Sequence, residues 1–241
     1  MALAFVPILF YTPDMQSLFD FTTRDIGRWR DRLMPMLAEI EPLPRRKPIG
    51  QLVKSLISGR TRDPVSLSAY HSLRARFGSA RGIARADPRM VTQAIAEVTF
   101  AREKAEWLVT ALRMVGRERP DFCLDFLGEP PLDTALAWLE RLPGVGRKVA
   151  AATLNASTLR RPVLIVDGHV LRVLIRLGFV TARSDARTAS EAVTAAMPDW
   201  DADDFLTLHM LLKRLGQIAC RPDAPICGAC PLRRDCPSAH N

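Results

Sequence analysis

Lysine is scarce in this chain, and one of its lysines follows a turn that could place an amine for chemistry. Only five of the 34 basic residues are lysines, and the rest are arginines. Lys148 ends the segment LPGVGRK (142–148), at the start of a helical pattern. In the first turn of a helix the macrodipole disfavours an ammonium, which favours the neutral amine that attacks an electrophilic carbon. Lys148 is therefore a candidate nucleophile, although a solvated charge or a phosphate contact would also explain it.

A carboxylate stands just before another helical pattern, in the segment VDGHV (166–170). Its aspartate, Asp167, is of a residue type favoured at helix N-caps, so a purely structural role is one interpretation. A carboxylate held there could equally stabilise the positive charge that develops on a sugar ring during glycoside cleavage. The two roles are compatible in one residue.

The turn before Lys148 contains two glycines, Gly144 and Gly146. Glycines at this spacing predict a tight hairpin that another backbone can approach closely. The second helix would then open with free N–H groups, which suit a phosphate. We expect a helix–hairpin–helix over residues 139–159 that grips a DNA backbone without reading its sequence, with a plain structural turn as the alternative.

Cysteines form the second cluster that could do chemistry. Four of the five lie near the end of the chain with the spacing C-x6-C-x2-C-x5-C, namely Cys220, Cys227, Cys230 and Cys236. Prolines within this stretch exclude a continuous helix and favour a loop wrapped around a bound group. Four thiolates on one short loop fit either a tetrahedral zinc ion or a [4Fe-4S] cluster, and the count alone does not decide between them.

Composition places the chain among globular proteins with a polyanionic partner. Hydrophobic residues make up 48% and charged residues 25%, which excludes a disordered or collagen-like chain. The net charge of +8 points toward a polyanion. No segment is typical of a membrane span, because the apolar start, Met1 to Tyr11, is too short and lacks the positive region of a secretory signal. We expect a cytoplasmic protein, whose cysteines would serve as metal ligands rather than disulfides.

Hydrophobic periodicity is helical almost throughout, as in the stretches 107–115, 170–177 and 205–215. The only strand-like run, Val163 to Val166, is short and isolated. The sequence therefore predicts an all-α protein.

The hairpin with Lys148, the Val-Asp-x-His-x-x-Arg stretch from Val166 to Arg172 and the cysteine spacing together resemble the endonuclease III family of helix–hairpin–helix DNA glycosylases. The order and the intervals agree, and the resemblance covers roughly residues 25 to 240. It implies a two-domain, all-α fold. A six-helix barrel domain would span 49–160, and an iron–sulfur cluster domain would combine 25–48 with 161–241, after an N-terminal extension at 1–24.

The resemblance also implies roles. Lys148 would attack the sugar and hold it as a Schiff base, and Asp167 would assist base loss and the later proton transfers. The four cysteines would hold a [4Fe-4S] cluster. The partner would be duplex DNA that contains damaged bases or abasic sites, with the damaged nucleotide flipped out of the stack, and the protein would act as a monomer.

Five further residues are implied to meet DNA at or near the pocket. Gly144, Gly146 and Arg147 belong to the hairpin, Glu140 matches a polar position near the family's pocket, and His169 follows the catalytic aspartate.

Two DNA-facing positions depart from the family pattern. Arg60 stands where a glutamine usually fills the gap left by the flipped base, and Phe100 stands where a leucine wedge is usual. An arginine can fill and hydrogen-bond in such a gap, and an apolar wedge between bases is physically sound. Ala101 and Gly168 also replace an aromatic residue and a threonine. These departures concern the substrate range more than the chemistry.

The resulting prediction is a base-excision-repair DNA glycosylase with abasic-site lyase activity, with oxidised pyrimidines as the expected lesions. One alternative is a monofunctional, adenine-type mismatch glycosylase, which needs the aspartate but no Schiff-base lysine. A second is an enzyme that acts mainly as an abasic-site lyase. The third is a non-catalytic iron–sulfur protein that binds DNA damage, for which neither Lys148 nor Asp167 would be required.

Overall fold

The computed structural model describes residues 23–240. The apolar segment from Met1 to Tyr11 and most of the expected extension 1–24 lie outside the described residues. Within the described part the regular structure is helical, without a strand, as the all-α prediction requires. None of its helices is long and apolar enough to cross a membrane.

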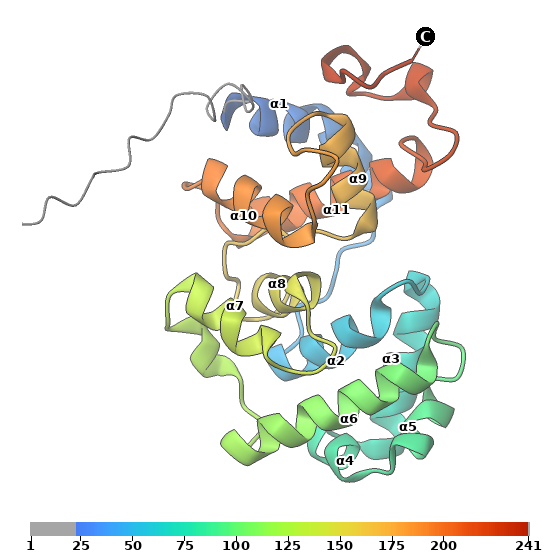
Figure 1. Ribbon diagram of the computed structural model, residues 1–241, viewed down its shortest axis with the longest axis vertical. Coiled ribbons are helices and arrows are strands. Elements are labelled where there is room, and N and C mark those ends of the chain that lie inside the picture. The colour runs from blue at the N-terminus through green and yellow to red at the C-terminus, as the bar shows by residue number, and fades with distance from the viewer. Residues whose placement is uncertain (1–22, 241) are drawn as a thin grey trace, which may run out of the picture.

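The helices gather into two lobes that lie one above the other in Figure 1. One lobe is built from the first helix and the last third of the chain. It consists of α1 (Thr23–Leu33), a short 3₁₀ helix (Met34–Glu39), α9 (Gly168–Arg176), α10 (Ala186–Ala196), α11 (Ala202–Ile218) and two 3₁₀ turns (Cys227–Ala229 and Arg233–Asp235). We call this the terminal lobe.

The central part of the chain forms the second lobe, which we call the central lobe. It consists of α2 (Pro48–Ser58), α3 (Asp63–Phe77), α4 (Ala80–Arg85), α5 (Pro88–Ala94), α6 (Ala101–Glu118), a 3₁₀ turn (Asp125–Gly128), α7 (Leu132–Glu140) and α8 (Arg147–Asn155). These are seven α-helices, one more than the resemblance implies. The short α4 and α5 are separate because Asp87 caps α5 and Pro88 opens it.

Local signals explain where the helices begin. Aspartate side chains accept backbone N–H bonds at the starts of α5, α9, α10 and α11. Proline stands at the first or second position of α2, α3 and α5, where its missing N–H costs nothing. Packing does the rest, because each lobe has its own buried apolar core.

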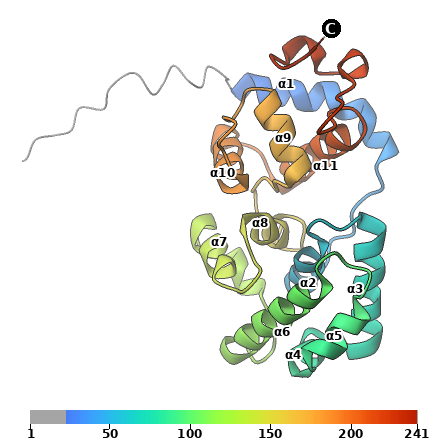
Figure 2. The same ribbon diagram turned by 45° about the vertical axis from the view of Figure 1, so that its right-hand side comes forward.

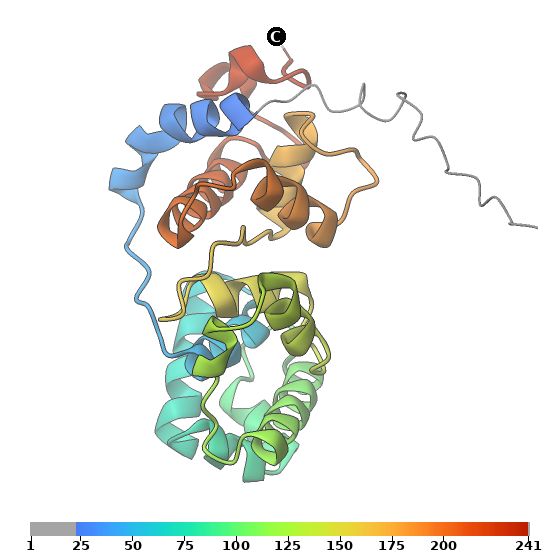
Figure 3. The ribbon, with the colours of Figure 1, turned by 90° about the vertical axis from the view of Figure 1, so that its left-hand side faces the viewer.

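The two cores meet at the connection between α8 and α9. Val163 and Ile165 belong to the core of the central lobe, whereas Leu164 and Val166 belong to that of the terminal lobe. Such alternation requires extended backbone, which explains the strand-like pattern although no strand forms here. In Figures 2 and 3 this connection and the segment before α2 cross between the lobes. Two cores fit a two-domain chain, and the domain boundaries given above stay predictions.

Candidate active site

A hairpin joins α7 to α8, where the two-glycine turn was expected. Gly144 adopts a left-handed backbone with φ 74°, and a Cβ atom there would lie 2.9 Å from Cβ of Trp107. Only glycine satisfies both conditions. Gly146 precedes α8 without a side-chain cap, and a Cβ there would meet nothing within 4 Å. The backbone beside Gly146, at the start of α8, is therefore open to the approach of a phosphate.

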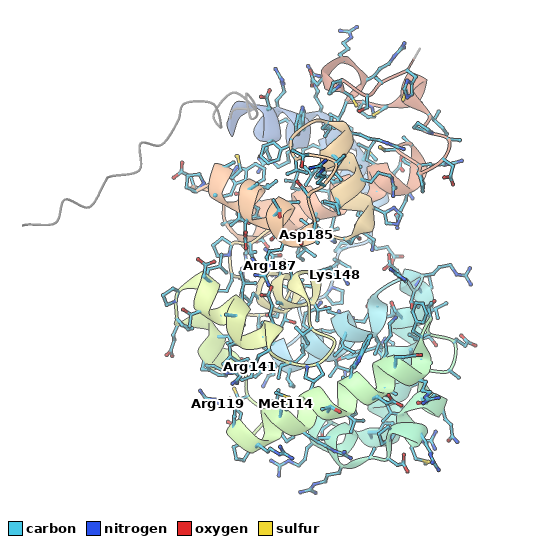
Figure 4. All side chains as sticks on the ribbon, in the orientation of Figure 1. Met114, Arg119, Arg141, Lys148, Asp185 and Arg187 are labelled. Atoms are coloured by element: carbon cyan, nitrogen blue, oxygen red, sulfur yellow. The ribbon has the colours of Figure 1, made fainter. Side chains whose placement is uncertain are left out.

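Lys148 is the second residue of α8 and lies where this helix faces the terminal lobe (Figure 4). Burial lowers the pKa of its amine, and the charge of Lys213 lowers it further, whereas Asp167 and Asp63 act in the opposite direction. The amine donates no hydrogen bond to any of the described residues. The arrangement favours the uncharged form that a nucleophile needs.

Asp167 caps α9 and lies within electrostatic range of Lys148. Its Oδ1 accepts hydrogen bonds from the amides of His169 at 2.9 Å and Val170 at 3.0 Å. Burial alone would raise the pKa of this carboxyl, but His209, the amide of Val170 and Lys213 outweigh it, so that the pKa lies below its ordinary value. Among the described residues nothing donates to Oδ2, which stays available for chemistry. Capping and a catalytic role are thus compatible.

His209 joins this site although the sequence analysis did not predict it. The side chain is buried on α11, and its Nδ1 lies 2.8 Å from the carbonyl oxygen of Ile165. A carbonyl only accepts, so Nδ1 carries the proton and Nε2 has the free lone pair. Burial lowers the pKa of His209 to about 4, which makes the ring neutral at pH 7.

Arg147 and Glu140, both expected to meet DNA, have partners within the protein. Arg147 is buried, and its guanidinium pairs with Glu140 at 2.7 Å and with Glu191 of α10 at 3.0 Å. Arg187 of α10 pairs with the other oxygen of Glu140, and Figure 4 shows it beside α8. These ion pairs tie the hairpin to the terminal lobe. Direct DNA binding by Arg147 and Glu140 stays a prediction, and the structure gives both of them a joining role.

His169, also expected to meet DNA, has a partner within the protein. Its Nδ1 lies 3.1 Å from Nη2 of Arg172, which in turn donates to the carbonyl oxygens of Gly216 and Cys220. The glycine at position 216 leaves room for the His169 side chain, because a Cβ atom at Gly216 would lie 2.8 Å from Cβ of His169. A DNA contact by His169 stays a prediction.

Arg60 and Phe100 lie together at two neighbouring loops. Both have left-handed backbones, with φ 55° and φ 58°, and the Arg60 guanidinium lies 5.9 Å from the centre of the Phe100 ring. Phe100 is 51% exposed, which is unusual for so large an apolar side chain. Left-handed backbone is costly for such residues, and it is concentrated at functional positions. We call this pair the Arg60–Phe100 tip.

Lys104 supports the loop that carries Arg60. Its buried amine donates to the carbonyl oxygens of Ile57 at 3.0 Å and of Gly59, and to Oγ1 of Thr61 at 3.2 Å. Thr61 in turn accepts a hydrogen bond from the amide of Thr99, next to Phe100. One lysine therefore holds both halves of the tip.

The four C-terminal cysteines line one cavity of about 420 Å³, together with Arg176 and Arg233. Arg176 donates to Sγ of Cys220 at 3.4 Å, and Cys236 donates to the carbonyl oxygen of Arg176 at 3.3 Å. In residues 23–240 no three His, Cys, Asp or Glu side chains are grouped so that they could hold a metal ion. The cavity thus has four thiol donors around a space larger than one ion needs.

The neutral state of His209 predicts a pH dependence of stability. The unfolded chain binds a proton near pH 6.5, whereas the folded protein binds it only near pH 4. Stability present above pH 6.5 is therefore lost as the pH falls through this window, by about 3 kcal/mol. In urea titrations the variant His209→Gln should lose less free energy of unfolding than the wild type between these pH values. The variant His71→Gln, at an exposed histidine of α3, should follow the wild type, and equal losses in all three proteins would contradict the assignment.

The support given by Lys104 predicts a local effect. Lys104→Met keeps the aliphatic packing but removes the donor to three acceptors and leaves the carbonyl oxygen of Ile57 without its side-chain partner, so the free energy of unfolding should fall by about 1–3 kcal/mol. Amide hydrogen exchange in residues 57–61 should accelerate. Lys47→Met, at an exposed lysine, is the matched control. Unchanged protection of these amides would show that Lys104 does not hold the tip.

Comparison with known proteins agrees with this geometry. Residues 53–199 match the model of the HhH-GPD superfamily of base excision DNA repair proteins. Endonuclease III of Thermotoga maritima is 31% identical over 189 residues, which cover 78% of this chain and 82% of that protein.

Solved structures show the same fold. A trapped covalent intermediate of endonuclease III with DNA matches with a TM-score of 0.73 at 23% identity, over 91% of this chain and 97% of the other. A thermostable thymine-DNA glycosylase matches with a TM-score of 0.71 at 17% identity, over 90% and 97%. The chain therefore belongs to the endonuclease III family of DNA glycosylases, within the HhH-GPD superfamily of base excision DNA repair proteins.

Proposed function

We propose that this enzyme is a bifunctional DNA glycosylase and abasic-site lyase that removes damaged bases from duplex DNA, with oxidised pyrimidines as its substrates. The observation that carries the proposal is the state of Lys148. Its amine lies at the start of α8, has a lowered pKa, and has Asp167 within electrostatic range. A family member that only hydrolyses the glycosidic bond needs no such amine.

The reaction follows from these two side chains. The neutral amine of Lys148 attacks C1′ of the flipped nucleotide while the bond to the base breaks, and the base leaves with the electron pair and gains a proton. Asp167 stabilises the positive charge that develops on the sugar. The ring then opens to an iminium ion, a C2′ proton is removed, and the C3′–O bond breaks, which nicks the strand. Hydrolysis of the iminium ion returns the amine.

Binding to DNA would use three features already described. The open backbone beside Gly146 suits a DNA phosphate, and the Arg60–Phe100 tip suits the gap left by the flipped nucleotide. The net charge of +8 supports attraction to a polyanion. The class of lesion and the monomeric state are part of the proposal, as is action in the cytoplasm.

The four cysteines fit a [4Fe-4S] cluster better than a zinc ion. A zinc ion holds four sulfur atoms at about 2.3 Å from one centre and needs little space. A cuboidal cluster is larger, and the cavity of about 420 Å³ that all four cysteines line has room for it. Cys220, Cys227, Cys230 and Cys236 would hold the cluster, which would stabilise the end of the terminal lobe. The chemistry at Lys148 does not pass through it.

Covalent trapping tests the mechanism. With borohydride present, the wild type should form an adduct with duplex DNA that contains thymine glycol or an abasic site, and Lys148→Ala should form none. Asp167→Asn should slow trapping on thymine glycol by at least about a hundredfold, because charge stabilisation of this kind contributes 10²–10³. Its effect on abasic DNA should be smaller, because the base has already left.

The other outcomes identify the alternatives. Trapping on the abasic site alone would indicate an enzyme that is mainly a lyase. Base release without trapping would indicate a monofunctional glycosylase, with adenine in mismatches as the next substrate to test. Binding to damaged DNA without either reaction would indicate a non-catalytic protein.

The cluster has its own test. The protein purified without oxygen should be brown, with absorbance near 400 nm and about four iron and four sulfide per chain. Cys236→Ser should lose most of this absorbance, whereas Cys123→Ser, outside the cavity, should keep it. A colourless wild-type protein that contains one zinc per chain would overturn the assignment.

A further inference from the structure

The few lysines of this chain gather around one point. Lys54 and Lys104 lie within electrostatic range of Lys148, and so does Lys213. Only Lys47 is elsewhere, at the exposed start of α2. Of the four other lysines in the chain, three therefore lie near the proposed nucleophile. Like charges so close together disfavour full protonation of the group.

Three of these amines are held by acceptors. Lys54 donates to Oγ of Ser58 at 2.9 Å and of Ser66 at 3.0 Å. Lys104 donates to the carbonyl oxygens and the threonine hydroxyl described above. Lys213 donates to Oδ2 of Asp63 at 2.6 Å. Hydrogen bonds of this kind stabilise the charged form of an amine.

Lys148 differs from these three lysines. Within residues 23–240 its amine donates no hydrogen bond, and the positive end of α8 adds to the surrounding positive charge. Lys148 is therefore the lysine of this group whose charged form has no hydrogen-bond acceptor among the described residues.

Charged groups surround Lys148 on several elements. Lys54 comes from α2, Asp63 from α3, Lys104 from α6, Asp167 from the start of α9, and Lys213 with His209 from α11. Helices α7 and α10 also pack against α8, and their charged groups Glu140, Arg187 and Glu191 form ion pairs with Arg147 or with one another. His209 is neutral at pH 7, and Asp63 and Asp167 oppose the lysines. Asp63 is compensated by its contact with Lys213, which leaves Asp167 as the carboxylate that attracts the Lys148 proton.

Lys213 has a particular place in this group because it comes from the other lobe. Lys148 and Asp63 belong to the central lobe, whereas Lys213 lies on α11 of the terminal lobe. The contact between Lys213 and Asp63 therefore crosses the junction of the lobes. It brings a cation to Lys148 and at the same time compensates a nearby carboxylate that would keep the nucleophile protonated.

We propose that Lys213, held by Asp63 across the two lobes, is a positioning residue that keeps the Lys148 amine uncharged and ready to attack. Lys213 does not touch the reacting atoms and acts through its charge. This inference rests on the proposed role of Lys148 as the Schiff-base residue. It adds a residue outside the hairpin and the aspartate segment to the requirements of the reaction.

Protonation can be measured without DNA, because the chain has only five lysines. In protein labelled with [¹³C]lysine, the Cε signals can be assigned by single substitutions and followed as the pH changes. The Lys148 signal should titrate below the ordinary pKa range of a lysine. In Lys213→Met this titration should move to higher pH, because a cation is lost and Asp63 is left uncompensated.

Trapping on abasic DNA measures the consequence. In Lys213→Met the acid limb of the pH–rate profile for trapping should move to higher pH. At a fixed pH on that limb, the trapping rate should fall about tenfold for each pH unit by which the limb has moved. Lys213→Arg keeps the charge and the contact with Asp63, so it should restore both the titration and the rate. Lys47→Met is the matched control and should leave both unchanged, and equal melting temperatures would show that the fold is intact.

The outcomes separate this inference from the proposed function. If the wild type traps DNA but Lys213→Met leaves the Lys148 titration and the pH profile unchanged, the role of Lys213 is wrong and the mechanism stands. A uniform loss of rate without movement of the profile would also overturn it, since that loss indicates a structural role only. If the wild type traps nothing while the Lys148 signal moves as expected, the electrostatic inference holds and the proposed function fails.

Discussion

An amine placed at the junction of two lobes, without a hydrogen-bond acceptor among the described residues, is the constraint on which this site depends. Burial of a charged ammonium is costly unless a partner compensates it, and a buried lysine that lacks one gives up its proton instead. Lys148 is in this position, at the positive end of α8. Its neighbours Lys54, Lys104 and Lys213 all donate hydrogen bonds to acceptors of the protein. The protein therefore obtains a neutral nucleophile from the distribution of acceptors, with little help from a dedicated base.

The junction between the lobes fixes the second participant. Residues 163–166 alternate between the two cores, so the segment cannot slip by one residue without exposing apolar side chains and burying their neighbours in the wrong lobe. Asp167 follows this segment directly and is held further by the amides of α9. Its distance from the hairpin is thus set by the packing of both lobes. The ion pairs of Arg147 and Glu140 with α10 restrain the hairpin from the other side.

Local sequence was enough to predict the helical class, the hairpin and the positions of Lys148 and Asp167 at helix starts. These features depend on glycine backbone freedom, capping and periodicity, which act over a few residues. His209, Lys213 and Asp63 come from helices remote in the sequence, and their approach to Lys148 depends on how the lobes pack. The scarcity of lysine was the one signal that could have indicated Lys213. Arg147 is an example of the opposite case, in which local sequence suggests too much. An arginine in a hairpin of this kind predicts a phosphate contact, but the structure pairs it with Glu191 of the terminal lobe, which is remote in the sequence.

The division of labour between lysine and arginine has a physical basis. Arginine does not lose its proton in proteins, and its planar fork suits a carboxylate, as where Arg147 and Arg187 share Glu140. An ammonium is compact and directs three donors around one point, which matches the two carbonyl oxygens and the hydroxyl around Lys104. At Lys148 the requirement is different again, because the group must become neutral, and only lysine can do so. At Lys104 and Lys148 an arginine would therefore fail, at the first because of its shape and at the second because it keeps its proton.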